Sequence, residues 1–140
     1  TVTAHLRGTS IRRFSNGATT SPGTVTLTEG AAIPSGGVFV IAYNQTDFEA
    51  AFGAGAADQF SGAISGNGDD VYQLYAGGRV IDQYGVLGQR PAVGTSWNYQ
   101  DIAVIRDIPT VVAPTATFNL DEWLYVEPAT VPDDFTPGIP

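Results

Sequence analysis

The apolar residues of this chain fall into short runs separated by glycine and proline, and this pattern constrains the fold most strongly. The longest run, Val38 to Tyr43, is too short for a typical helix and far short of a membrane span. Val25 and Leu27 alternate with threonines, as residues of a half-buried strand do. We therefore expect a fold of short β-strands, in which Val38 to Tyr43 forms a strand buried on both faces.

The clearest hairpin of the sequence joins Val71–Tyr75 to Arg79–Tyr84. Both segments are rich in β-branched and aromatic residues, and Ala76-Gly77-Gly78 between them supplies the glycines that a tight turn requires. Further strands are expected at Ile102 to Arg106 and at Trp123 to Val126. Short strands spaced by turns predict an all-β, antiparallel sandwich.

One short helix is expected within this β-rich chain. Thr46 to Glu49 fits a capping box, in which a Thr hydroxyl and a Glu carboxylate bind the free amides of the first turn. Phe48 and Phe52 are four residues apart and would share the face that points to the core. Gly53 would end the helix.

Charge and composition exclude several classes of protein. The chain has 140 residues, enough for one domain, and its fourteen acidic residues outnumber six arginines to give a net charge of −8. Such a surface opposes direct binding to nucleic acid, which needs a basic face. Low charge, no Lys and abundant Thr, Gly and Ala are typical of secreted bacterial proteins, so we expect an extracellular location on a bacterial cell surface.

The central hairpin and its flanks also resemble a known family, the bacterial lamin-tail domain. The resemblance rests on Gly66-Asn67-Gly68-Asp69-Asp70, on Val71–Tyr75 with Gly78–Asp82 and Gly85, on Ser10–Gly17, on Ile33–Ala42, and on Arg106 with Glu122-Trp123. It implies an Ig-like β-sandwich, as found in secreted and surface proteins that include extracellular nucleases. It carries no catalytic residue onto any position of this chain.

The resemblance also implies a domain layout. Residues 1–127 would form the sandwich, and 128–140 would form a Pro-rich C-terminal tail. The family opens with strands for which there is little room before Leu6, so we expect those strands to have been cut off or to come from another chain. A sheet without its edge strand exposes unpaired backbone groups and invites strand addition.

The sequence predicts no enzyme: we assign no catalytic, cofactor-binding or metal-binding residue. His5 has no nucleophile motif around it and is expected at the surface. Asp69 and Asp70 are adjacent, so in a strand they point to opposite faces, and we expect Asp69 to bind local amides at the hairpin entry. Calcium is the alternative, held by Asn67, Asp69 and Asp70 with Asp82 or Asp101, although no calcium-loop motif supports it.

We expect a non-catalytic structural or interaction module that binds protein. Self-assembly through an open sheet edge would make this module a homo-oligomer. One alternative is an accessory domain of a secreted nuclease or phosphoesterase. Another is carbohydrate binding on a platform of aromatic side chains. The candidates for that platform are Tyr72, Tyr75, Tyr84, Trp97, Tyr99, Trp123 and Tyr125, although Trp123 and Tyr125 share a face that suits the core better.

Overall fold

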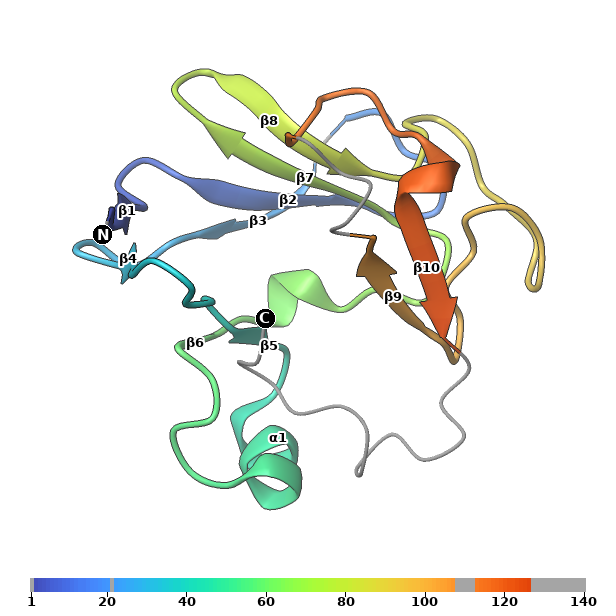
Figure 1. Ribbon diagram of the computed structural model, residues 1–140. Helices are drawn as coiled ribbons and strands as arrows, with labels where there is room; N and C mark the ends of the chain where they lie inside the picture. The colour runs from blue at the N-terminus through green and yellow to red at the C-terminus, as the bar shows by residue number, and fades with distance from the viewer. Residues whose placement is uncertain (1, 21, 108–112, 127–140) are drawn as a thin grey trace.

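Figure 1 shows the computed structural model of the chain, which describes residues 2–20, 22–107 and 113–126. The predicted tail 128–140 lies outside the described residues. The described part is mostly β-structure with one short α-helix. Its elements are β1 (Ala4–His5), β2 (Ser10–Phe14), β3 (Gly23–Thr26), β4 (Ala32–Ile33), β5 (Ile41–Ala42), α1 (Gln45–Phe52), β6 (Gln59–Phe60), the 3-10 turn η1 (Gly62–Ile64), β7 (Val71–Ala76), β8 (Arg79–Tyr84), β9 (Ala103–Arg106), the 3-10 turn η2 (Leu120–Glu122) and β10 (Trp123–Val126).

The largest sheet has four antiparallel strands in the order β3-β2-β7-β8. It contains the predicted hairpin, which is confirmed, with the turn at Gly77-Gly78. Tyr72 pairs with Tyr84 across the hairpin, and a register shift follows between Leu74 and Tyr75. Strand β2 joins the hairpin along β7, so residues about sixty positions apart become neighbours.

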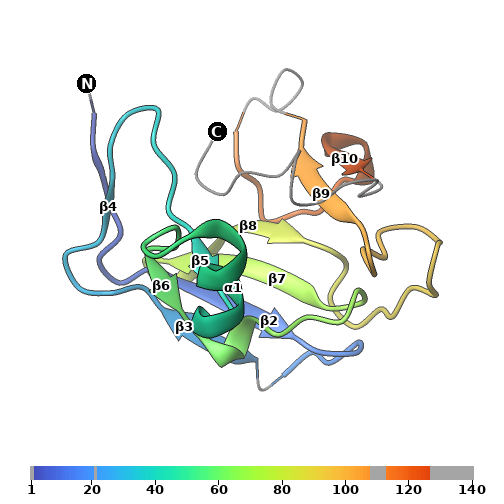
Figure 2. The same cartoon turned by 90° about the horizontal axis from the view of Figure 1, so that it is seen from below.

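Three two-stranded sheets accompany it within the described residues: β1-β4 and β9-β10 are antiparallel, whereas β5-β6 is parallel. In Figure 1 the ribbon β9-β10, the pair β5-β6 and helix α1 all lie below the four-stranded sheet. Figure 2, seen from below, places α1 in front of that sheet. The inner face of the sheet is therefore covered by separate small elements.

The prediction of one long buried strand at Val38 to Tyr43 was wrong. Only Ile41 and Ala42 are in a strand, because β6 supplies two partner residues and no more. Ala42 is buried, whereas Tyr43 is 58% exposed. The apolar run is held partly by other means, since the Val40 N–H donates to the Asp58 carboxylate at 2.7 Å.

Helix α1 forms where it was expected but begins earlier. Its N-cap is Asn44, whose side chain accepts a hydrogen bond from the Asp47 N–H at 3.2 Å, so the predicted cap at Thr46 was wrong. Both Asn and Thr are good caps, but Asn44 has the extended backbone of a cap, with φ −129° and ψ 123°, whereas Thr46 already lies inside the helix. The rings of Phe48 and Phe52 do share a face, 4.8 Å apart, but neither residue is buried, so the expected contact with the core was wrong. Gly53 ends the helix with a φ of 91°.

The buried apolar centre lies at the end of the four-stranded sheet where the loop after β8 folds back. Phe14, Val71, Tyr84 and Trp97 form this cluster, with partly buried rings from β10 and the preceding segment packed against it. The Tyr84 hydroxyl donates to the Trp97 carbonyl at 2.6 Å, which satisfies a polar group inside the core. Val25 and Leu27 are also buried, as their alternation predicted.

Candidate functional site

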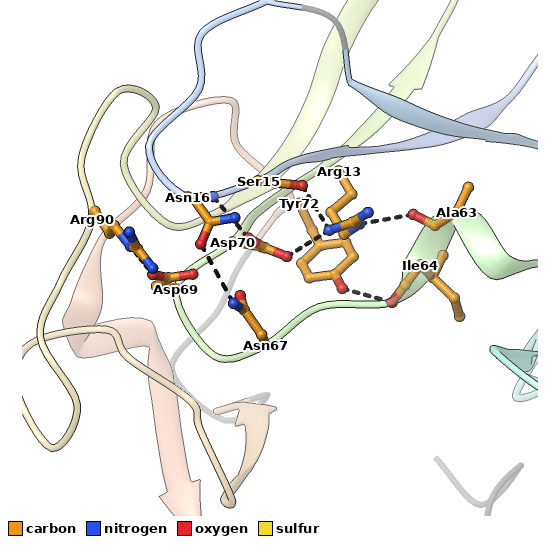
Figure 3. Close-up of polar contacts among 10 residues, drawn as sticks. All are labelled: Arg13, Ser15, Asn16, Ala63, Ile64, Asn67, Asp69, Asp70, Tyr72 and Arg90. Atoms are coloured by element: carbon orange, nitrogen blue, oxygen red, sulfur yellow. Dashed lines mark hydrogen bonds and ion pairs between the residues drawn. The ribbon is translucent and has the colours of Figure 1, made fainter.

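The entry to the β7-β8 hairpin is built around a buried carboxylate, that of Asp70. Its side chain is 1% exposed and accepts from Arg13 Nη1 at 2.8 Å and from the Asn16 N–H at 2.9 Å (Figure 3). Arg13 lies on β2 and also donates to the Ala63 carbonyl at 2.9 Å and to Ser15 Oγ at 2.7 Å. The pair therefore ties β2, β7 and η1 together.

Asp69 has a different partner, although it is adjacent in sequence. Figure 3 shows its side chain reaching the guanidinium of Arg90, with which it forms an ion pair. The Arg90 side chain is 62% exposed whereas that of Asp69 is 9% exposed, so solvent reaches this pair from the arginine side. Asp69 Oδ1 is buried without a partner among the described residues. The expected binding of local amides by Asp69 was wrong: the backbone amide is bound by Asp70.

The described residues give calcium no further support. The carboxylates of Asp69 and Asp70 each face an arginine, and Asp82 pairs with Arg106. Within the described ranges, no group of three or more His, Cys, Asp or Glu residues is arranged to hold a metal ion. The carboxylate oxygens of this region accept hydrogen bonds from guanidinium and amide groups.

Close packing explains why glycine occupies two positions of the segment Gly66-Asn67-Gly68-Asp69-Asp70, which leads into the hairpin. Gly68 has a φ of +107°, and a Cβ there would lie 2.5 Å from Gln100 Cβ and 2.7 Å from its Cα. A Cβ at Gly66 would overlap the hydroxyls of Tyr72 and Tyr99. The loop before the hairpin can approach these side chains closely only because both positions lack a side chain.

A second charged cluster joins the ribbon β9-β10 to the four-stranded sheet. Arg106 on β9 forms ion pairs with Asp82 on β8 and with Glu122, the latter at 2.8 Å. Its guanidinium also lies over the Trp123 ring, 4.9 Å from the centroid. The resemblance singled out Arg106 and Glu122-Trp123, but no local signal pointed to Asp82 as the third partner.

Aromatic side chains line a cleft of about 230 Å³ between the four-stranded sheet and the ribbon. Its walls are Tyr72, Tyr84, Tyr99, Val104 and Trp123. The predicted flat platform does not form from the whole aromatic set, because Trp97 is 2% and Tyr84 is 8% exposed. Trp123 and Tyr125 pack against the core, as their shared face predicted.

Alkaline pH tests the burial of these phenols. Burial raises the pKa of Tyr84 and of Tyr99 above the ordinary value of 10.0, and does so for Tyr72 and Tyr125 as well. Unfolded phenols ionise near pH 10 while the folded ones stay protonated, so the stability is full below that pH and is lost above it. We expect the free energy of unfolding in urea to fall between about pH 9.5 and pH 11.5.

The loss of stability can be assigned to tyrosine ionisation, because the chain has no Lys and no Cys that would titrate in the same pH range. Absorbance at the phenolate wavelength, followed on the folded chain, measures the ionisation directly. A free energy of unfolding that stays level across the same interval would contradict the raised pKa values.

The outer face of the ribbon β9-β10 is apolar and exposed. Ile105, Leu124 and Val126 are 44%, 50% and 44% exposed, and Ile105 and Leu124 are direct cross-strand partners. His5 is exposed on β1, as expected. Among the described residues, no helix has the length and apolar character needed to cross a bilayer.

Comparisons with protein-family models, with curated proteins and with solved structures each gave no match.

Proposed function

We propose that this chain is a non-catalytic interaction module that self-associates through the ribbon β9-β10. The observation that carries this proposal is the outer face formed by Ile105, Leu124 and Val126, each more than two-fifths exposed. Contiguous exposed apolar residues on a soluble protein typically mark an interaction surface. We propose a bacterial surface or secreted protein as the setting and an Ig-like sandwich as the fold.

A second copy of the chain is the partner that this face fits best. These three side chains carry no charge, so the repulsion expected between two molecules of net charge −8 is weakest there. A partner of opposite charge would gain nothing from such a face. Two copies related by a twofold axis would bury the same apolar residues on both sides.

The backbone of β10 supports the same partner. The Asp107 N–H donates to the Glu122 carbonyl at 2.9 Å, and the alternation of an antiparallel ladder then directs the backbone groups of Tyr125 away from β9. No other described strand pairs with β10. An antiparallel β10-β10 contact would extend two ribbons into one four-stranded sheet, which is more stable than an isolated pair. In that sheet the Leu124 and Val126 side chains of the two copies lie on one face as cross-strand neighbours and cover part of each other.

The test is the solution mass, measured by size-exclusion chromatography with light scattering over a concentration series. We expect the wild type to rise from the 14.6 kDa of one chain toward twice that value. Leu124→Lys should keep the mass at one chain, whereas Val93→Lys, at a loop position that is 65% exposed, should behave as wild type. Calcium should change nothing, because arginines face Asp69 and Asp70.

A wild type that stays at the mass of one chain throughout the series would overturn self-association. Circular dichroism and a thermal melt of Leu124→Lys serve as the folding control. Since the Leu124 side chain is half exposed, a charge there should leave the melt close to that of wild type.

A further inference from the structure

The aromatic cleft is separate from the outer face of the ribbon, and it has the features of a binding site for a small molecule. Val104 and Trp123 contribute to it from β9 and β10, and Tyr72 and Tyr84 from the hairpin β7-β8. We propose that this cleft binds a small, uncharged aromatic molecule of one or two fused rings that carries a hydrogen-bond acceptor.

The shape of the walls favours a flat ring as the ligand. The rings of Tyr84 and Trp123 meet edge to face, with centroids 4.9 Å apart and planes at 80°. Tyr84 and Tyr99 meet in the same way, at 5.6 Å and 75°. Aromatic pairs prefer edge-to-face and offset arrangements, so a further flat ring laid against these walls from the cleft can continue the pattern.

An unpaired donor explains the acceptor that we assign to the ligand. Trp123 Nε1 is buried and has no hydrogen-bond partner among the described residues. An indole N–H can only donate, and a buried donor without an acceptor is costly. A carbonyl or ether oxygen on the ligand would pair with this donor after a small local adjustment.

The absence of ionised groups from the walls favours an uncharged ligand. All five lining residues are neutral, and the nearby guanidinium of Arg106 already pairs with Asp82 and Glu122. An ionic ligand would lose its hydration without gaining a counter-charge. A small neutral ring loses little hydration free energy on entering such a cleft.

The volume sets the size of the ligand. A dry cavity of about 150 Å³ holds a benzene ring in an engineered protein, so a cleft of about 230 Å³ accommodates one ring with a substituent or two fused rings. A second hollow of about 140 Å³ adjoins it and shares Tyr72, Tyr84 and Trp123 as walls. This second hollow could receive the substituent.

The test is calorimetric titration of the full chain with three probes. Acetophenone carries a ring and an acceptor, toluene carries the ring alone, and glucose carries hydroxyls without an aromatic ring. We expect saturable binding of acetophenone, about fivefold weaker binding of toluene because one hydrogen bond is lost, and no binding of glucose. Acetophenone that fails to saturate, or glucose that binds better, would overturn the proposal.

Two variants locate the site. Trp123→Phe keeps a ring but removes the N–H, so the affinity for acetophenone should fall to about that for toluene. Val104→Phe fills the cleft and should abolish binding without lowering the melting temperature. If Val104→Phe does not fold, Trp123→Phe still decides the question, because unchanged affinity in that variant would contradict the donor that we assign.

Leu124→Lys separates this proposal from the one above. Leu124 faces outward from the ribbon and does not line the cleft, so this variant should bind acetophenone as the wild type does. The two proposals can therefore fail independently: the chain can bind the probe without self-associating, or self-associate without binding the probe. Loss of probe binding in Leu124→Lys would show that the cleft exists only in an assembled form, and would overturn a site within one chain.

Discussion

Asp70→Asn is expected to lower the free energy of unfolding by about 3 kcal/mol, which corresponds to a melting temperature lower by about 10 °C. The substitution keeps the size of the side chain but removes the charge that faces Arg13. The Arg13 side chain is 16% exposed, so its guanidinium would remain largely buried without a counter-ion. The bond that holds the Asn16 amide, at a residue with a φ of 53°, would weaken as well.

The matched control is Asp69→Asn, one position earlier. Asp69 pairs with an arginine side chain that is 62% exposed, and surface pairs contribute less than about 1 kcal/mol. We expect this variant to unfold within about 1 kcal/mol of the wild type. Urea unfolding followed by circular dichroism measures both. Equal losses in the two variants would contradict the assignment of Asp70 as the structural carboxylate.

Trp97→Ala is expected to cost about 3–5 kcal/mol of stability, enough to leave a marginal domain largely unfolded at physiological temperature. The Trp97 ring is 2% exposed and packs edge to face on Tyr84, with centroids 6.2 Å apart. The ring also lies against Gly85, where a Cβ would come within 2.9 Å of it. Removing the indole would open a cavity that the neighbouring backbone cannot close.

Tyr43→Ala is the control for this substitution, because Tyr43 is aromatic and 58% exposed. We expect its thermal melt to stay close to that of the wild type. The comparison also decides the role of Trp97 in the carbohydrate hypothesis: a folded Trp97→Ala protein that had lost only glycan binding would contradict the assignment of this side chain to the core.

Local sequence was enough to predict much of the secondary structure. The hairpin Val71–Tyr84 was predicted because its strands are rich in β-branched and aromatic residues and its turn contains two glycines, and both requirements are met within fourteen residues. The same holds for Trp123–Val126 and for the burial of Val25 and Leu27. Backbone conformation and the alternation of faces depend mainly on near neighbours.

Contacts between residues that are distant in sequence decided which side chains are buried, which charges are paired and where strands end. Asp69 and Asp70 are chemically identical neighbours that are both buried, and only the approach of Arg13, 57 positions away, gives Asp70 the more buried counter-ion. The apolar run at Val38 to Tyr43 became a two-residue strand because β6 offers no more backbone to pair with. The aromatic cleft arises where β9 and β10 meet the hairpin. Burial, ion pairing and cavities are properties of contacts between segments, so the sequence could supply the side chains while only the tertiary structure could bring them together.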